Sequence, residues 1–177
     1  MKFKFLICVM LLLPTIASAK ISNPSFYQTI DDDTGQKKSI VALYNYKNAQ
    51  GDDLLAGRII ALYNLDTGKI SETLNNPVRI ADKVKGAPKM AGMDILWDMK
   101  FDLGDNEYFD GHIMDPKKGK IYRSVIWQDT DSANKLQVRG KIGPFGRTQT
   151  WNVLKVSDLP ADLQNLNTKN WAPVVIE

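Results

Sequence analysis

The sequence has few residues that bind metals or form covalent cross-links. It contains one cysteine, Cys8, and one histidine, His112. Cys8 lies in the first nineteen residues, so residues 20–177 contain no thiol. A disulfide framework and a thiolate metal site are therefore excluded there, and one histidine is too few for a typical zinc site. We expect no metal and no cofactor.

The chain also lacks an excess of charge of one sign. Lys and Arg number 23 against 20 Asp and Glu, which gives a formal net charge of +3. Two of the basic residues, Lys2 and Lys4, belong to the first nineteen residues, so the rest of the chain has a net charge of about +1. A near-neutral chain of this kind has no electrostatic footprint for nucleic acid, and we expect no nucleic-acid partner.

Long apolar runs are absent apart from residues 5–13. This run is shorter than the roughly 20 residues that a membrane-spanning helix needs. It follows Lys2 and Lys4, ends at Pro14, and precedes the small residues 17–19, a pattern typical of a secretory signal peptide. Cys8 lies inside the run rather than at its end, which argues against a lipid anchor. The sequence thus predicts cleavage after Ala19 and export to the periplasm or beyond, without a membrane span in the mature protein.

From residue 20 onward, short alternating stretches are separated by turn residues, which is typical of an antiparallel sheet. In residues 135–142, apolar and charged or polar side chains alternate with a period of two. The expected strands are residues 25–30, 39–46, 54–63, 95–101, 107–114, 120–128, 135–142 and 147–154. Residues 69–92 have no sustained period and predict a long excursion. Residues 160–166 predict a short helix.

Eight consecutive strands must close or fold over to bury one face and protect their edges. The predicted fold class is all-β and mainly antiparallel: an eight-stranded up-and-down β-barrel over residues 20–154. A C-terminal extension with a short helix follows over residues 155–177. A two-sheet sandwich is the alternative. The interior of an eight-stranded barrel is either filled by side chains or holds one small ligand.

Five motifs, in this order and spacing, resemble those of a small exported bacterial family, catalogued as domain of unknown function 2147 (DUF2147). They are Gly-Arg-Ile-Ile at 57–60, Gly-His-Ile-Met-Asp-Pro at 111–116, Gly-Lys-Ile-Tyr at 119–122, Lys-Leu-Gln-Val-Arg-Gly at 135–140 and Phe-Gly-Arg-Thr-Gln-Thr-Trp at 145–151. The resemblance covers about residues 25–154 and implies a lipocalin-like (calycin) barrel without an established activity. Two departures are Ser-Phe-Tyr at 25–27, where the family usually has Gly-x-Trp, and the lack of cysteine in residues 69–92.

A calycin-like barrel implies that an arginine of a late strand stacks on an aromatic residue of the first strand and closes the barrel. Tyr27 would be the aromatic residue, and Arg139 or Arg147 the arginine, with Trp151 in the same closing strand. Such a stack contributes about 0.5–2 kcal/mol. The sequence does not decide which arginine faces the interior. The alternative role for one of them is to bind an anionic ligand head.

The resemblance favours a binding protein for a small lipophilic or amphipathic ligand, by analogy of fold. Ligand sites are mostly apolar with a few polar groups. We expect His112, Tyr122 and Arg123 to orient the polar end of the ligand, and Trp97 and Met114 to line the pocket. Residues 69–92 would partly cover the mouth.

Two other functions stay open. The first is an envelope protein–protein interaction module with a solid core, in which residues 171–176 could add to a partner as a strand. The second, less favoured, is a hydrolase-type enzyme that uses Asp110 and His112, which share one face of a regular strand. We expect that the protein is not an enzyme. The oligomeric state is not predicted.

Overall fold

A computed structural model describes residues 20–176 of the chain. The predicted signal peptide, residues 1–19, lies outside the described residues. The nine strands are β1 (Ser25–Ile30), β2 (Lys37–Lys47), β3 (Asp53–Tyr63), β4 (Ile70–Thr73), β5 (Asp94–Asp102), β6 (Glu107–Asp115), β7 (Lys120–Gln128), β8 (Lys135–Ile142) and β9 (Phe145–Leu154). The eight predicted strands are all present, and β4 is an addition within the predicted excursion.

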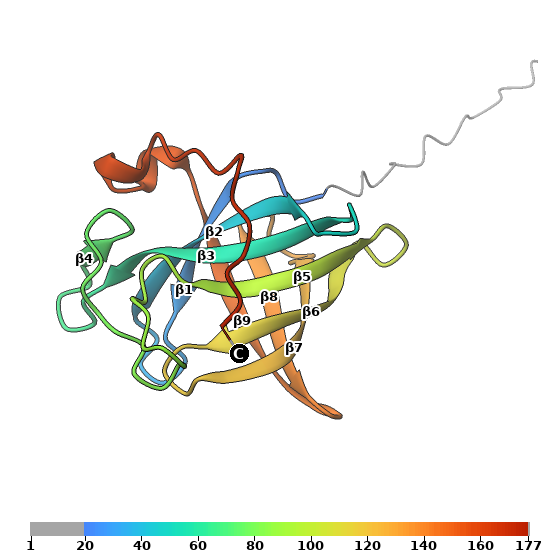
Figure 1. Ribbon diagram of the computed structural model, residues 1–177, viewed down its shortest axis with the longest axis horizontal. Coiled ribbons are helices and arrows are strands. Elements are labelled where there is room, and N and C mark those ends of the chain that lie inside the picture. The colour runs from blue at the N-terminus through green and yellow to red at the C-terminus, as the bar shows by residue number, and fades with distance from the viewer. Residues whose placement is uncertain (1–19, 177) are drawn as a thin grey trace, which may run out of the picture.

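The strands form a closed antiparallel barrel (Figure 1). The sheet runs in the order β2-β1-β9-β8-β7-β6-β5-β3, and pairing of β2 with β3 closes it. The short β4 pairs only with β3 and lies outside the ring of eight. The predicted all-β, eight-stranded up-and-down barrel is thus confirmed.

Tight turns between the strands are stabilised by side chains of the turn residues themselves. In the β1–β2 turn, the Asp31 carboxylate accepts hydrogen bonds from the backbone N–H groups of Asp33 and Thr34, both at 3.2 Å. Gly35 follows with a φ of 70°, a left-handed conformation that side chains disfavour. Such local hydrogen bonds stabilise a tight turn. Strands that are consecutive in the sequence can therefore pair side by side in the sheet.

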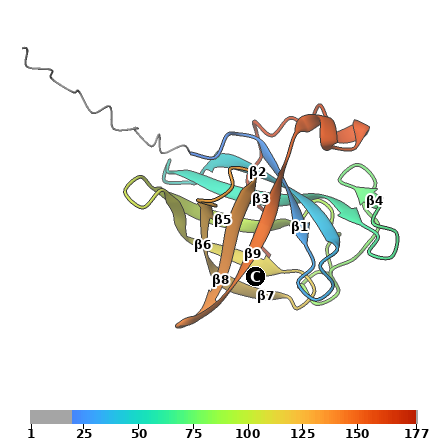
Figure 2. The same ribbon diagram turned by 180° about the vertical axis from the view of Figure 1, so that it is seen from behind.

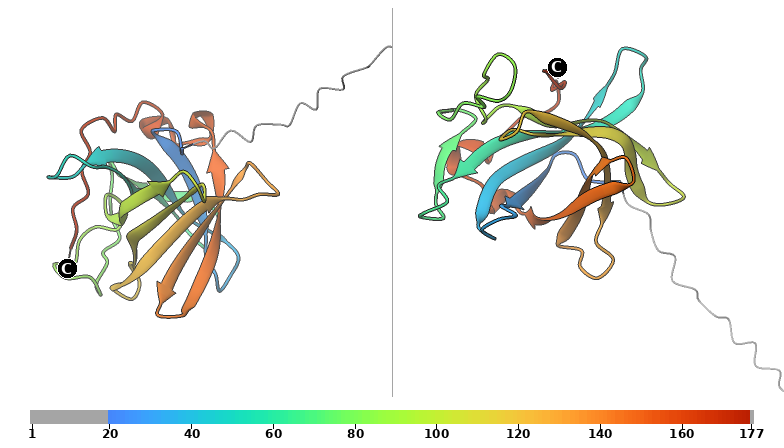
Figure 3. Two further views of the ribbon diagram at one scale, coloured as in Figure 1. Left: turned by 90° about the vertical axis from the view of Figure 1, so that its right-hand side faces the viewer. Right: turned by 90° about the horizontal axis from the view of Figure 1, so that it is seen from below.

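Two apolar cores lie on the two faces of the sheet. The interior core includes Tyr27, Leu43, Met99 and Trp151, all buried. The outer core joins the outside of β1, β2 and β3 to Leu159, Leu163 and other apolar residues of the C-terminal segment. Figures 1 and 3 show this segment passing along the outside of the barrel.

The C-terminal segment has no α-helix over residues 155–176, the part that the structure describes. It has two 3-10 turns, Val156–Asp158 and Ala161–Leu163. The helix expected over residues 160–166 is therefore reduced to one turn, a correction to the prediction. A helix this short gains little from its own hydrogen bonds. The turn is held by Leu163, which is fully buried against the barrel.

The last residues dock on their own barrel through Asp94 at the start of β5. The Asp94 carboxylate, 1% exposed, accepts two hydrogen bonds from Arg58 at 2.9 and 2.8 Å, and one from the Tyr44 hydroxyl at 2.7 Å. It also accepts the backbone N–H of Val174 at 2.9 Å. The Arg58 guanidinium lies 4.4 Å from the centre of the Trp171 ring. Residues 171–176 are thus structural rather than free.

The excursion over residues 69–92 is ordered by a buried carboxylate. Glu72 on β4 accepts the backbone N–H groups of Val78 and Arg79, at 2.7 and 2.8 Å, and pairs with the Arg79 guanidinium. A β-bridge joins Ile80 to Lys89. This folds the excursion back toward the barrel, and its residues Arg79 and Met90 reach the cavity described below.

Candidate ligand-binding cavity

The barrel contains a cavity of about 460 Å³ at the end where the β1–β2, β6–β7 and β8–β9 turns meet. These three turns lie toward the lower end of the barrel in the left view of Figure 3. Apolar side chains from five strands form the deeper wall of the cavity: Ile59, Leu62, Ile95, Met114, Val138 and Trp151.

Side-chain packing fills the opposite end of the barrel. At Gly57, an added Cβ would lie 2.8 Å from the Leu43 side chain, and at Gly111 it would lie 2.2 Å from the Met99 sulfur. Neighbouring side chains therefore occupy the space that these two glycines leave. The barrel is solid at that end, so the cavity is confined to the open end.

Gly140 on β8 helps to keep the open end hollow. It lines the cavity, and a Cβ added there would lie 3.4 Å from Ile113 and 3.6 Å from Tyr122, both ordinary contact distances. Every other interior position of β8 has a large apolar side chain. The missing side chain at Gly140 thus contributes directly to the cavity volume.

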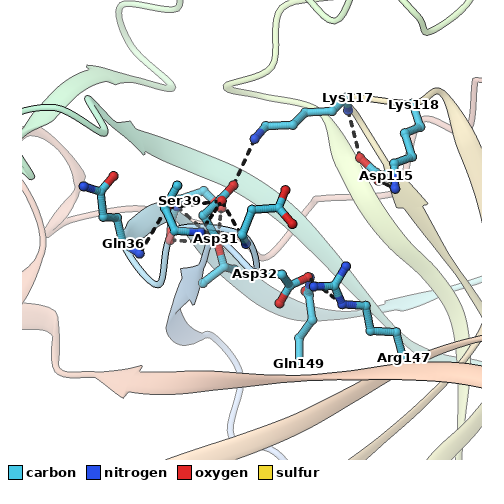
Figure 4. Close-up of polar contacts among 12 residues, drawn as sticks. Asp31, Asp32, Gln36, Ser39, Asp115, Lys117, Lys118, Arg147 and Gln149 are labelled. Carbon is cyan, nitrogen blue, oxygen red and sulfur yellow. Dashed lines mark hydrogen bonds and ion pairs between the residues drawn. The ribbon is translucent and has the colours of Figure 1, made fainter.

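Charged residues of the turns form the rim of the cavity (Figure 4). The Lys117 amino group lies 2.9 Å from the Asp31 carboxylate, and this pair joins the β6–β7 turn to the β1–β2 turn. The hydrogen bond from Lys117 lowers the pKa of Asp31 to about 2, although burial of the carboxylate opposes the shift.

A second set of contacts joins the β1–β2 turn to β9. Arg147 lies 3.3 Å from the Asp32 carboxylate, which also accepts a hydrogen bond from Gln149. Figure 4 shows these side chains approaching one another across the mouth. The rim therefore contains both signs of charge above an apolar interior, which makes the cavity amphipathic.

Of the five side chains predicted to contact a ligand, the structure places Tyr122 and Met114 in the cavity wall. Trp97, His112 and Arg123 are not part of it. His112 pairs with Trp97 and Arg123 in the neighbouring strands, and its ring stacks on that of Trp97 with centroids 5.6 Å apart. These three residues form a separate group outside the cavity wall.

A bulge in β6 explains this placement. The β6–β7 register shifts between Tyr108 and Gly111, and Asp110 has a φ of 56°. A bulge adds one residue to one strand and so reverses which face the following side chains occupy. Tyr108 is buried in the interior core, whereas His112, four residues on, lies opposite Arg123, whose side chain is 63% exposed.

The expected closing stack on Tyr27 is absent among the described residues. Tyr27 lies opposite Val153, whereas Arg147 lies opposite Gly140, six residues or about 20 Å away along β9. Arg147 is therefore at the rim of the cavity, and Arg139 is not in the cavity wall. Tyr27 and Trp151 are both buried in the interior core.

The rim residues Asp31, Asp32 and Lys117 were not predicted from the sequence. In the sequence they occur in turn-forming stretches, and turn formation accounts fully for them there. Their functional interest comes from pairing across the mouth between segments 86 residues apart. The feature of the sequence that could have identified them is the clustering of charged residues in these two turns.

A second hollow, of about 590 Å³, lies on the outside of the barrel. Its wall includes Val125, Trp127, Arg139 and Lys141, together with polar residues of the β5–β6 turn. It lacks an enclosed apolar interior, so the barrel cavity is the better candidate for an amphipathic ligand.

Residues 26–153 match the sequence model of a family described as "Uncharacterized protein conserved in bacteria (DUF2147)". The chain belongs to this family. The DUF2147 match covers all strands of the barrel except the first residue of β1 and the last of β9.

Among solved structures, the DUF2147 barrel is similar to one titled "Protein HP1028 from the human pathogen Helicobacter pylori belongs to the lipocalin family". The two chains are 21% identical, the match covers 82% of this chain and 89% of that one, and the TM-score is 0.50. This likeness concerns the fold. No curated protein matches this chain.

Two further findings concern residues 20–176. None of the helices there is long and apolar enough to cross a membrane. The same residues include no group of three or more His, Cys, Asp or Glu side chains placed to hold a metal ion.

Proposed function

We propose that this protein binds one small amphipathic ligand in the cavity at the open end of its barrel. The observation that carries this proposal is an apolar interior beneath a charged rim. The volume of about 460 Å³ lies within the range of roughly 300–1,000 Å³ found for small-molecule sites. The lipocalin-like fold, shared with the H. pylori protein, is compatible with this role.

The apolar part of the ligand would lie against Ile59, Val138 and Trp151, at the deeper end of the cavity. Burial there supplies affinity in proportion to the apolar area removed from water, at about 25 cal/mol per Å². The polar part would lie at the mouth, where Tyr122 and Arg147 offer hydrogen-bond donors. The ligand therefore enters with its apolar end first.

We further propose that the protein works outside the cytoplasm. The support is the pattern of residues 1–19, in which a basic start precedes a short apolar run and small residues.

An enzymatic role for Asp110 and His112 has little geometric support. The Asp110 carboxylate is engaged by Lys100 at 2.7 Å and by Arg123 at 2.8 Å. His112 Nδ1 is buried without a hydrogen-bond partner among the described residues. A general acid–base pair needs its members within hydrogen-bond reach. We propose a binding protein without catalysis at this pair.

The experiment that tests the proposal is a titration of the purified protein, residues 20–177, with a fluorescent long-chain fatty acid. Trp151 lies in the cavity wall, so its emission should decrease by energy transfer to the bound probe. The expected result is saturable binding of one probe per chain, competed by an unlabelled single-chain amphiphile. Non-saturable uptake of several such probes would contradict the proposal.

A further inference from the structure

The β8–β9 hairpin extends beyond the rest of the barrel at the open end (Figures 1 and 2, orange). Every residue from 141 to 148 is exposed. At the tip, Ile142 and Phe145 pair with each other across the turn and are 64% and 78% exposed. Two large apolar side chains thus lie next to each other in solvent, at the end of a protruding hairpin.

These two residues are also part of the cavity mouth, because both contribute to its wall. Scattered exposed apolar residues are common on protein surfaces and have no special meaning. A pair at the tip of a projecting hairpin beside the opening of an amphipathic cavity is a more specific arrangement. It places an apolar surface where a ligand must pass.

Cationic side chains surround this apolar tip. Lys117, Lys118 and Arg147 are each more than half exposed, and each is paired with one carboxylate of the rim. Lys120 and Lys141 are exposed and have no ion-pair partner in the part of the chain that the structure describes. Lys141 adjoins the apolar tip directly, and Lys120 begins the neighbouring strand at the same end of the sheet.

We propose that the open end of the barrel docks on the surface of a bilayer that contains anionic lipids. Phe145 and Ile142 would insert into the interfacial zone, and Lys120 and Lys141 would contact the lipid headgroups. Peripheral membrane binding depends on buried apolar area together with electrostatic attraction to anionic lipids. The hairpin has apolar side chains and cationic side chains at one place.

A bilayer fits this surface better than a protein partner. A stable protein interface buries about 800 Å² on each side, across 20 to 30 residues. The tip is narrow and convex, with two large apolar side chains. A bilayer accepts such a wedge because lipid headgroups and chains rearrange around it.

Docking in this orientation directs the cavity mouth toward the lipids. An amphipathic molecule could then pass between bilayer and barrel without crossing open water. This consequence rests on the proposed function, whereas the docking itself does not require a loaded cavity.

The test is sedimentation of the purified protein with vesicles of phosphatidylglycerol and phosphatidylcholine mixed, and with vesicles of phosphatidylcholine alone. The expected result is binding to the anionic vesicles that weakens as salt rises, since salt screens surface charge. The double variant Ile142→Ser/Phe145→Ser should bind at least about tenfold more weakly. Lys120→Gln and Lys141→Gln should each weaken binding about fivefold.

The matched control is Leu103→Ser. Leu103 is 70% exposed in the β5–β6 turn and does not contribute to the cavity mouth or to the hairpin, so its loss should leave vesicle binding unchanged. Thermal unfolding of each variant shows whether it is folded. Gly140→Leu, which fills the cavity, should still dock, and this separates a failure of docking from a failure of ligand binding.

Three results would overturn the proposal. One is equal binding to both kinds of vesicle, and another is unchanged binding of the folded tip variant. The third is a dimer in solution that the tip variant dissociates, because the hairpin would then serve a second copy of the chain.

Discussion

Replacing Gly140 by leucine should fill the cavity and leave the barrel intact. Gly140 lies on the interior face of β8, and its missing side chain contributes to the cavity. The first carbon of a side chain would make ordinary contacts, at 3.4 Å from Ile113 and 3.6 Å from Tyr122. The remaining carbons would extend into the cavity. Glycine also weakens strands through backbone entropy, so stability should stay within about 1 kcal/mol of the parent protein.

The expected loss of affinity follows from the volume that leucine occupies. Its side chain has about four carbon atoms, which displace about as many methylene groups of a ligand. Each displaced group forfeits about 0.8 kcal/mol of burial, or about 3 kcal/mol in all. This corresponds to a dissociation constant more than about a hundredfold higher. Gly140→Ala adds one carbon, and it should weaken binding about fourfold at most.

The assay is the fluorescent fatty-acid titration, run on the three proteins side by side, with urea unfolding to confirm their stability. Equal affinity of a stable Gly140→Leu protein and its parent would refute the reasoning, because it would place the ligand elsewhere. An outcome in which Gly140→Ala weakens binding as much as Gly140→Leu would refute the volume argument.

Three further predictions concern the packing that supports the site. Asp94→Asn should lower the free energy of unfolding in urea by about 3–5 kcal/mol, because it leaves the Arg58 charge buried and unpaired; a loss below about 1 kcal/mol would contradict this. Trp171→Ala should expose residues 171–176 to limited proteolysis while the barrel stays folded, and unchanged protection would disprove their docking through Arg58. The pKa of Asp31 is lowered to about 2, so its stabilising effect is present above the unfolded value near 3.8 and is lost as pH falls toward 2. Asp31→Asn should therefore destabilise the protein by about 1–2 kcal/mol in urea at pH 7 and have little effect near pH 2; an equal effect at both pH values would rule out the Lys117 pairing as the cause.

The strands were predictable because their signals are local. Residues 135–142 alternate with a period of two, and turn residues such as Asp31 and Gly35 separate the stretches. Closure into a barrel followed from the number of consecutive strands. The short β4 was missed because Ile70–Thr73 is only four residues long and pairs at an edge.

The face of the sheet on which an individual side chain lies was harder to predict. The bulge at Asp110 depends on a left-handed backbone conformation at a residue that is not glycine. Nothing in the surrounding sequence distinguishes it from a regular strand. As a result, His112 was expected to contact a ligand but stacks on Trp97 outside the cavity wall.

The rim also depends on tertiary structure. Lys117 and Asp31 belong to different turns, and Arg147 and Asp32 are more than a hundred residues apart. Only the closed barrel brings them together around one opening. Trp151 and Met114 could be expected in an interior from their apolar character, but the sequence does not separate cavity lining from solid core.

The most direct test of the central claim is native mass spectrometry of the protein purified from the bacterial cells that produce it, followed by organic extraction. If the barrel cavity holds one small amphipathic ligand, the parent protein should carry an extractable molecule of that class at one per chain. The Gly140→Leu protein should carry none. A parent protein with a clean unliganded mass, and no uptake of an added fatty acid, would contradict the account.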